Sequence, residues 1–497
     1  MEKTAPSVKI LKTELSKTRD DAAIIGFFKG KLALSPELKK LDRAIGEALS
    51  FYIRNSGFKG DKGEFGSVFA NNGIKNIVIA GLGEEQKYSL DILSSAVADA
   101  SKRIRGNGAE SFSIYLDSFK NKFKEEEAAE KAALSSLIGL YQFTKFKTKD
   151  RDKIKHVSQI TIITNSGKNF DSQIRYASVV ADAVNKTRDL VNTPPNIATP
   201  EFVANYAKEL ARKSGLKCAV FDERQIEKMK MGCFTGVARG SANKPRLVVL
   251  EYNGSGKKPI AIVGKGVTFD SGGLNVKPYP YILNMKDDKG GAVAAMHIIE
   301  ACSKLKLRLS LIVITPLCEN MIDAASYRPD DVLTAYNKMT VEIKNTDAEG
   351  RLILADALSY AAELKPQAIF DIATLTGASL VVLGYVGTPF VCTDDKLRAK
   401  LKTASSKSLE KLWELPLWQE YEEQLKSDVA DLKHIGDEGE AGVITASMFL
   451  KNFVNDVAWA HIDIGTTVWS KVDRGVLTKG ATGATVRLLM EMLRDWE

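Results

Sequence analysis

Short apolar segments rich in β-branched residues alternate with helix-length segments along most of the chain. This alternation predicts layered α/β folds built on largely parallel sheets. Because the chain has 497 residues and a single core stops growing at about 250–300 residues, we expect at least two domains. The predicted strands are 76–81, 112–116, 160–164, 246–252, 260–264, 309–315, 368–373 and 458–464, and the predicted helices are 35–50, 90–104, 125–143, 170–191, 291–305, 351–364, 439–453 and 482–496.

The periodic segment 170–191 separates two parts of different character. Pro194 and Pro195 follow it and cannot continue a helix. We therefore expect an α/β class chain in which a smaller N-terminal α/β domain (1–168) is joined by a connecting helix (169–193) to a larger α/β domain with a central mixed sheet (194–497), which we expect to be catalytic.

The composition excludes several classes of protein. A hydrophobic content of 44% and a charged content of 27% are those of a soluble globular chain, not of a disordered or fibrous one. The uncharged stretch 372–392 is long enough to cross a membrane, but Gly377, Gly384, Gly387 and Pro389 interrupt it, so we expect a buried strand and turns.

Location is predicted from the N-terminus and the cysteines. Residues 1–12 lack the apolar core of a secretory signal. The five cysteines form no CxxC pair, which indicates reduced thiols in a cytoplasmic protein and argues against a thiolate zinc site. Four scattered histidines with no HExxH motif leave carboxylates as the main metal ligands available.

The net charge of +8 is uneven, because residues 1–160 carry a basic excess of seven. A solvated lysine-rich surface explains this excess most simply. DNA binding by the N-terminal domain is the alternative, although basic residues and aromatics do not form clear interleaved runs.

Three segments place charge where a core is expected, namely 263–273, 284–291 and 345–352. Each one lies where an apolar strand gives way to a loop or a helix, and each alone is compatible with a turn or a helix cap. Asp347, Glu349 and Arg351 are spaced two residues apart, so in an extended chain their side chains project to the same side. Asp287 and Asp288 are adjacent and cannot both face the same side, so at most one of them is expected to be a ligand.

Together the segments supply four carboxylates that would repel one another unless a cation neutralises them. Two divalent cations suit this number better than one, and oxygen ligands allow Zn, Mn or Mg. Lys265 could join only as a neutral amine, while Lys277 and Arg351 remain available to polarise a carbonyl or to hold an anion. A two-metal phosphoesterase or nuclease is the alternative, but no phosphate-binding loop is evident. The four carboxylates are Asp270, Asp288, Asp347 and Glu349.

The sequence Asn-Thr-Asp-Ala-Glu-Gly-Arg-Leu at 345–352 resembles the signature of the leucine (cytosol) aminopeptidases. The segments 263–273, 192–196, 374–377 and 460–464 are similar to the same family, so the likeness covers nearly all of residues 180–497. Residues 1–160 fit that family only in size and α/β character. Two departures concern substrate preference and metal affinity: Lys289 stands where the family commonly has Met, and residues 484–486 replace a more usual Arg-Pro stretch.

The resemblance implies a zinc or manganese exopeptidase that removes N-terminal residues, leucine often favoured, by means of a water that bridges two metals. It implies metal ligation by Lys265, Asp270, Asp288, Asp347 and Glu349, with Asp270 and Glu349 bridging. Lys277 would polarise the scissile carbonyl, and Arg351 would hold a bicarbonate ion as general base. Peptide substrates, a homo-hexamer and a side-chain pocket are also implied, the pocket lined by Met285, Thr374, Leu375 and Gly377.

Overall fold

The computed structural model describes residues 5–71 and 73–496. These residues form two compact units. The first unit runs up to Asp182 and includes Lys471–Lys479, and the second comprises Ala183–Ser470 and the segment from Gly480. The boundary therefore lies within the long helix α5 (Asp171–Asn192). The limits that we expected from the sequence, 1–168, 169–193 and 194–497, stay a prediction.

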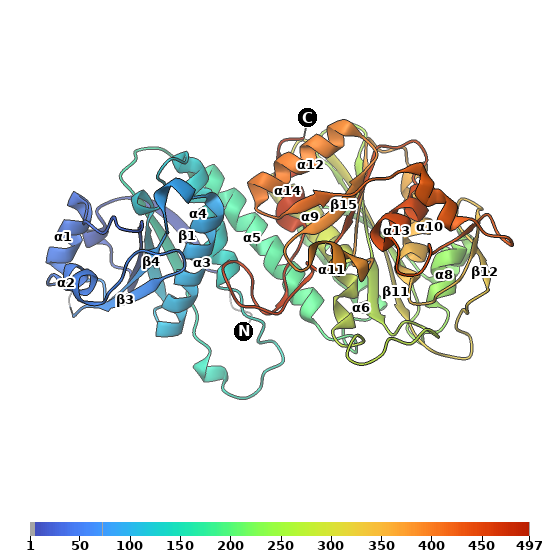
Figure 1. Ribbon diagram of the computed structural model, residues 1–497, viewed down its shortest axis with the longest axis horizontal. Helices are drawn as coiled ribbons and strands as arrows, with labels where there is room; N and C mark the ends of the chain where they lie inside the picture. Colours follow the sequence, from blue (N-terminus) through green and yellow to red (C-terminus); the bar gives the residue numbers. More distant parts are fainter. Residues whose placement is uncertain (1–4, 72, 497) are drawn as a thin grey trace. The chain divides into compact units, whose positions relative to one another are not determined.

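The first unit is a six-stranded sheet between two pairs of helices (Figure 1). Its strand order is β1-β6-β5-β2-β4-β3, and all neighbours are parallel except β3 and β4. Helices α1 and α2 pack with the apolar cluster on one face, and α3 and α4 cover the other. The elements are β1 (Ser7–Lys12), β2 (Ala22–Phe27), α1 (Pro36–Ala44), α2 (Ala48–Asn55), β3 (Phe65–Phe69), β4 (Asn76–Gly81), α3 (Leu90–Asn107), β5 (Ser111–Tyr115), α4 (Glu125–Gly139) and β6 (Gln159–Thr164).

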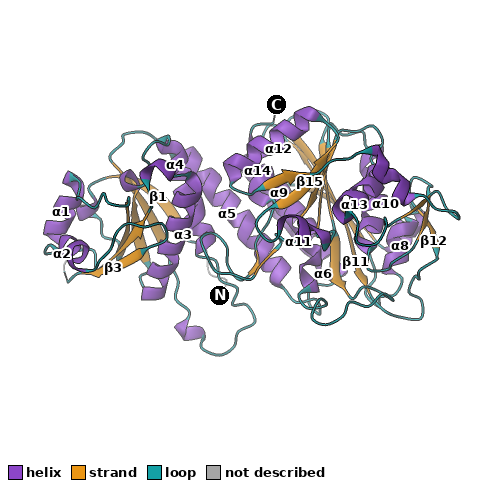
Figure 2. Cartoon of the chain, in the orientation of Figure 1, coloured by secondary structure: helices purple, strands orange, loops and turns teal. Residues whose placement is uncertain are grey.

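The second unit is a larger mixed sheet with helices on both faces, as Figure 2 shows. The strand order is β16-β15-β18-β14-β9-β11-β8-β7, with β10 beside β11. The sheet strands are β7 (Lys217–Phe221), β8 (Arg246–Asn253), β9 (Ile260–Gly264), β10 (Gly266–Asp270), β11 (Ser310–Asn320), β14 (Ile369–Ala373), β15 (Thr388–Cys392), β16 (Leu412–Glu414) and β18 (Trp459–Asp463), and the helices are α6 (Pro200–Ser214), α7 (Glu223–Lys228), α8 (Gly232–Ala238), α9 (Gly290–Leu305), α10 (Glu349–Glu363), α11 (Ala378–Leu383), α12 (Asp395–Ser408), α13 (Gly442–Lys451) and α14 (Val486–Arg494).

The centre of this sheet explains where polar side chains can gather. Strands β18, β14, β9 and β11 run parallel to one another, and every residue of β9, β14 and β18 is buried. Helix α9 packs against β9, β11 and β14, as does α10. Because both faces are covered, a ligand can reach such a sheet only at the ends of its strands, and in α/β sheets the carboxyl ends are the usual binding edge.

The α/β class and the central mixed sheet are confirmed, but the expectations for two helices and one loop were wrong. Segment 35–50 is two helices, α1 and α2, because Gly46 and Glu47 have positive φ and the Asp42 carboxylate accepts hydrogen bonds at the start of α2. The helix expected at 125–143 ends at Gly139 and is buried on all sides from Ala128 onward, so it is not amphipathic. Strands β1, β2 and β3 were not foreseen.

The third wrong expectation concerns the loop after Lys265. Residues 266–270 form strand β10, which pairs in parallel with the last residues of β11. Strand β11 extends to Asn320, five residues beyond its expected end at 315. This extension supplies the pairing partner, and it places Asp270 at the end of a strand and not within a loop.

Across the described ranges, no helix combines the length and the apolar character that crossing a membrane requires.

Candidate active site

The charged segments converge at the carboxyl ends of the central strands. Lys265 directly follows β9, and Asp270 is the last residue of β10. Asp288 lies in the short 3-10 helix η5 (Met285–Lys289) that leads into α9. Asp347 and Glu349 stand at the beginning of α10. Parallel strands and the helices that follow them thus bring together residues that are far apart in the sequence.

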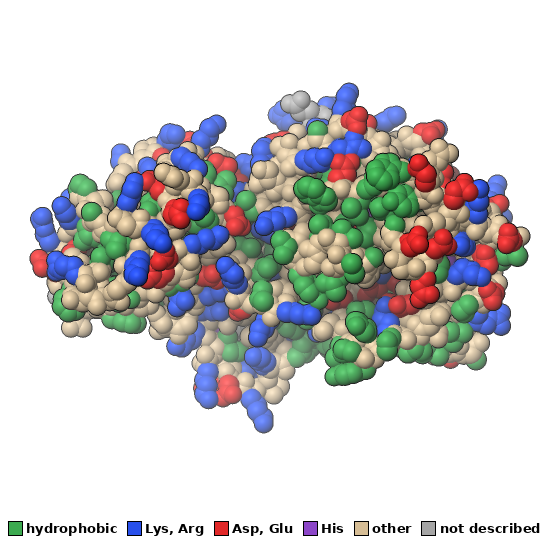
Figure 3. All heavy atoms as spheres, viewed as in Figure 1, with side chains coloured by type: hydrophobic (Ala, Val, Ile, Leu, Met, Phe, Trp, Pro, Cys, Tyr) green, Lys and Arg blue, Asp and Glu red, His purple; other side chains and the backbone are tan. Residues whose placement is uncertain are grey.

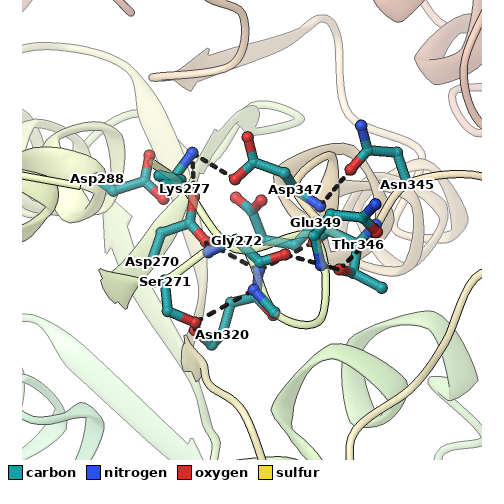
Figure 4. A network of polar contacts seen from close by, with 12 residues as sticks. Asp270, Ser271, Gly272, Lys277, Asp288, Asn320, Asn345, Thr346, Asp347 and Glu349 are labelled. Carbon is teal, nitrogen blue, oxygen red and sulfur yellow. Dashed lines mark hydrogen bonds and ion pairs between the residues drawn. The ribbon is translucent and has the colours of Figure 1, made fainter. Parts of the chain in front are cut away.

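Three of the carboxylates form one tight group. Asp270, Asp347 and Glu349 each offer an oxygen, and these oxygens all lie within 4.8 Å of one another. The ammonium group of Lys277 lies between two of them (Figure 4), with Nζ 2.9 Å from Asp270 Oδ2 and 2.5 Å from Asp347 Oδ1. One lysine therefore neutralises part of a cluster that would otherwise repel itself.

The fourth carboxylate, Asp288, joins the group through Lys265. The Lys265 Nζ lies 2.7 Å from Asp288 Oδ1 and 2.8 Å from Glu349 Oε1. It also donates a hydrogen bond to the Thr374 carbonyl at 2.7 Å. Gly350 makes this arrangement possible, because a Cβ there would lie only 2.6 Å from Lys265 Nζ. Four carboxylates and two ammonium groups thus form one network, which is buried except at the half-buried Asp347 and Lys277.

The pKa values of the charged groups in this network are shifted by burial and by their charged neighbours. Burial is the main cause that raises the pKa of each of the four carboxylates above its usual value. Burial lowers the pKa of Lys265, but the charges of Asp288 and Glu349 more than reverse that effect, and its pKa is raised overall. The pKa of Lys277 is raised for the same reasons, with Asp270 the strongest partner. Each charge is tolerated only because charges of opposite sign adjoin it.

The donor set fits divalent cations. Two ammonium groups each lie between two carboxylates, which are the positions where positive charge is needed. Asp288 Oδ2 is buried and accepts no hydrogen bond from any residue of 5–71 or 73–496, so it has an unused acceptor. Carboxylate oxygens without a thiolate suit Zn, Mn or Mg. The residues present therefore fit a carboxylate-bound metal centre.

Arg351 is held next to this network by a residue that sequence reasoning missed. Its Nη1 donates to the carbonyl oxygen of His434 at 2.8 Å. The His434 ring contacts the Asn345 carbonyl through Nε2 at 2.9 Å. Burial, followed by the charge of Arg351, lowers the pKa of His434 to about 4, so the ring is neutral at pH 7. Burial lowers the pKa of Arg351 to about 10, which leaves it cationic.

The residues expected to line a side-chain pocket have different environments. Thr374 is buried, and its hydroxyl donates to Asp288 Oδ1 at 2.6 Å. Leu375 packs against the main apolar core of the unit, and Gly377 is exposed with open space around its Cα. Met285 is half-buried at the start of η5. Of these four residues, Thr374 is hydrogen-bonded to the carboxylate group. The described contacts do not bring all four together around one shared neighbour.

Neutral side chains connect the charged segments to one another, and these too were missed. Asn320 donates from Nδ2 to Asp270 Oδ1 at 2.8 Å and to the Thr346 carbonyl at 3.0 Å. Asn275 and Thr346 exchange hydrogen bonds between the loop that carries Lys277 and the loop that carries Asp347. The position of Asn320 after an apolar strand was the one local signal that could have found it.

Comparison with known proteins identifies the family. The model of the cytosol aminopeptidase family catalytic domain matches residues 185–490, and that of its N-terminal domain matches residues 24–150. A probable cytosol aminopeptidase of Alkaliphilus metalliredigens is 36% identical over 497 residues, which cover 98% of this chain and 99% of the relative. A probable cytosol aminopeptidase of Aquifex aeolicus is 38% identical over 491 residues, which cover 98% of each protein.

Solved structures agree with these matches. A tomato leucine aminopeptidase mutant superposes with a TM-score of 0.90 at 32% identity, over 99% of this chain and 98% of that one. The bottromycin maturation enzyme BotP in complex with Mn gives a TM-score of 0.85 at 30% identity, over 96% of this chain and 99% of that one. With its two-unit α/β fold and its buried carboxylate cluster, the chain therefore belongs to the cytosol aminopeptidase family of metal-dependent peptidases.

Proposed function

We propose that this protein is a two-metal aminopeptidase that hydrolyses N-terminal residues from peptides, leucine and other apolar residues among them. The observation that carries the proposal is the group of Asp270, Asp347 and Glu349, whose oxygens lie within 4.8 Å of one another beside two lysines. A peptidase has to activate water and stabilise an oxyanion, and a carboxylate-held pair of cations suits both needs.

The five residues that we propose as metal ligands are Lys265, Asp270, Asp288, Asp347 and Glu349. Asp270 and Glu349 each lie within reach of other carboxylates of the group, so they would hold the ions together with those neighbours. Divalent ions bound there, Zn or Mn with Mg as an alternative, would supply Lewis-acid polarisation of the substrate carbonyl and lower the pKa of water. Lys265 would take part as a neutral amine, which metal contact favours.

Lys277 and Arg351 are the proposed catalytic side chains. Lys277 stays protonated because Asp270 and Asp347 adjoin it, so it can donate a hydrogen bond to the carbonyl oxygen as negative charge develops there. Arg351 has a buried Nε–H group that donates to no acceptor among the described residues, which leaves a donor free for an anion. A bicarbonate ion held there would serve as general base for water and return a proton to the leaving amine.

The substrate's first side chain would lie against Met285 and the 374–377 loop. Leu375 is partly buried and packs against the apolar core of the unit, and a Cβ at Gly377 would have open space around it. Apolar N-terminal side chains such as leucine suit surroundings of this kind better than charged ones do. We therefore propose Met285, Thr374, Leu375 and Gly377 as the residues that set the preference.

The direct test is hydrolysis of Leu-p-nitroanilide by the metal-free protein after addition of Mn²⁺ or Zn²⁺. We expect release of p-nitroaniline that depends on the metal and is abolished by a chelator. Hydrolysis that continues unchanged in the chelator, or no hydrolysis with either metal, would refute the proposal. Bis-p-nitrophenyl phosphate run in parallel tests the phosphoesterase alternative, which predicts phosphodiester turnover without peptide turnover.

We also propose a cytoplasmic homo-hexamer. The five cysteines of the chain are all unpaired thiols, as expected in a reducing compartment, and the relatives carry the name cytosol aminopeptidase. The hexamer is proposed from the family resemblance. Sedimentation velocity tests it, since a monomer at micromolar concentration would contradict it.

A second candidate function is nucleic-acid binding by the first unit. The loop between α4 and β6 projects from the unit and carries six exposed basic side chains (Figure 3). Clustered positive charge of this kind attracts phosphate backbones. Retention of the protein on double-stranded DNA at low salt, lost as salt is raised, would support binding, and no retention at low salt would exclude it. The basic side chains are Lys145, Lys147, Lys149, Arg151, Lys153 and Lys155.

A further inference from the structure

Asp463 is a buried carboxylate that lies beside the site and has no role in the mechanism above. It is the last residue of β18, and its register partner is Ala373, the last residue of β14. Its side chain is fully buried. Because β14 and β18 are parallel neighbours, the loop that leaves β14 at residues 374–377 begins next to this carboxylate.

The carboxylate of Asp463 holds that loop by several hydrogen bonds. Its Oδ1 accepts from the backbone N–H groups of Leu375 at 3.1 Å and Thr376 at 3.4 Å, and its Oδ2 accepts from the Thr376 hydroxyl at 2.7 Å. Gly465 also donates to Oδ1 at 3.0 Å. A Cβ at Gly465 would lie 2.8 Å from the Thr376 carbonyl, so the loop packs tightly against this turn.

The other end of the loop contacts the proposed metal ligands. The Thr374 hydroxyl donates to Asp288 Oδ1 at 2.6 Å, and the Thr374 carbonyl accepts from Lys265 Nζ at 2.7 Å. None of the hydrogen bonds of Asp463 goes to a proposed ligand itself. The hydrogen-bonded connection from Asp463 to the proposed ligands therefore runs through Thr374.

We propose that Asp463 is a positioning residue of the active site, which fixes the 374–377 loop so that Thr374 orients Asp288 and Lys265. This inference rests on the proposed function, because it assigns Asp463 to the support of the metal ligands. In an uncharged amide the oxygen can still take the place of Oδ1, but the negative charge that strengthens all four hydrogen bonds is lost, and the NH₂ group faces the Thr376 hydroxyl, which must then accept instead of donate. Loss of a residue that supports a ligand typically weakens metal affinity or activity by about 10–100-fold.

The test is a double-mutant cycle with D463N and T374V. Isothermal titration of Mn²⁺ into the metal-free proteins measures affinity without reference to turnover, and Leu-p-nitroanilide gives kcat and KM separately. We expect each single variant to bind Mn²⁺ at least about 10-fold more weakly than the wild type. We expect the double variant to be no weaker than T374V alone, because both changes interrupt one chain of contacts.

D356N is the matched control. Asp356 is equally buried and accepts hydrogen bonds from the backbone N–H groups of Phe234 at 2.8 Å and Tyr336 at 2.7 Å. It has no hydrogen bond to the 374–377 loop. We expect D356N to lower the melting temperature as D463N does, while its Mn²⁺ affinity stays at the wild-type value.

Several outcomes would overturn the inference. Wild-type Mn²⁺ affinity in D463N, equal losses in D463N and D356N, or additive losses in the double variant would each show that Asp463 acts only on stability or by another route. If D463N does not fold, T376V removes a single hydrogen bond to Asp463 and must itself weaken Mn²⁺ binding. A wild-type protein that neither binds Mn²⁺ nor hydrolyses Leu-p-nitroanilide would instead remove the proposed function, and the inference with it.

Discussion

The two units of this chain use the same layered α/β architecture, but a buried carboxylate of the first unit and the carboxylate group of the second have opposite surroundings. In the first unit, Asp20 is buried and accepts hydrogen bonds from Thr18, Ser113 and Gln159, all of them neutral donors. In the second unit, Asp270 faces other carboxylates and depends on Lys277 for neutralisation. A carboxylate satisfied by neutral donors stabilises a fold at modest cost, whereas a crowded group of carboxylates is costly unless cations bind it.

Carboxylates at helix N-termini also differ between the two units. Asp42 in the first unit accepts the backbone N–H groups of Leu49 and Ser50 and thereby caps α2. Glu349 occupies a similar place, the first residue of α10, but it faces Lys265 and the carboxylate group. A carboxylate group placed at a helix N-terminus can therefore act as a cap or take part in a charged cluster, and its neighbours in space decide which.

The largest expected effect comes from removing one carboxylate from each unit. E349Q should lower kcat/KM for Leu-p-nitroanilide by at least about 10³-fold, because bound cations contribute several kcal/mol to transition-state stabilisation. D20N should keep wild-type kcat/KM, since Asp20 serves the first unit only. Steady-state kinetics at saturating Mn²⁺ measure both. Equal losses of kcat/KM in E349Q and D20N would contradict the assignment of catalysis to the carboxylate group of the second unit.

The next effect concerns acid stability. The folded pKa of His434 is lowered to about 4 from 6.5, so the unfolded chain binds more protons between these pH values. The stability that the neutral ring contributes is full above pH 6.5 and is lost as the pH falls toward 4, by up to about 3 kcal/mol. Urea unfolding across this range should show a smaller pH slope for H434Q. An equal pH slope in H434Q and in the wild type would contradict this prediction.

Lys277 and Lys102 offer a comparison of two paired lysines. K277M should lower kcat for Leu-p-nitroanilide by about 10²-fold with little change in KM, because the proposed contact strengthens only as charge develops on the carbonyl oxygen. Lys102 pairs with Asp473 and donates to the Leu477 carbonyl within the first unit, so K102M should leave kcat unchanged. A rise in KM alone for K277M would assign Lys277 to substrate binding instead.

The smallest effect is the stabilisation of the second unit by Mn²⁺. At ten times its dissociation constant, the ion should add about 1.4 kcal/mol to the free energy of unfolding. Hydrogen exchange should then slow in β9, β10 and α10, while β2 and β4 of the first unit exchange as before. Slower exchange in both units would mean that Mn²⁺ stabilises the first unit as well, and not only the region around the carboxylate group.

Much of the architecture was predictable because burial on both faces leaves a clear pattern. Strands β4, β9, β14 and β18 were expected within one residue of their ends, since a short apolar run rich in β-branched residues has few alternatives. Edge strands such as β1 and β3 were missed because neither is a continuous buried run: β1 alternates between exposed and half-buried residues, and β3 between half-buried and buried ones before it ends on an exposed residue. Strand β10 was missed because its pairing partner, the end of β11, is remote in the sequence.

The candidate site divides in the same way. The sequence by itself determined which side chains are available for metal chemistry, because carboxylates and lysines that follow apolar strands are costly to bury without a purpose. Only the tertiary structure decided that Asp463, His434 and Asn320 belong beside them. These residues lie 88, 83 and 50 positions from their partners Leu375, Arg351 and Asp270. Strand pairing creates such contacts, and no local pattern records them, because each residue is chemically ordinary until its neighbours are known.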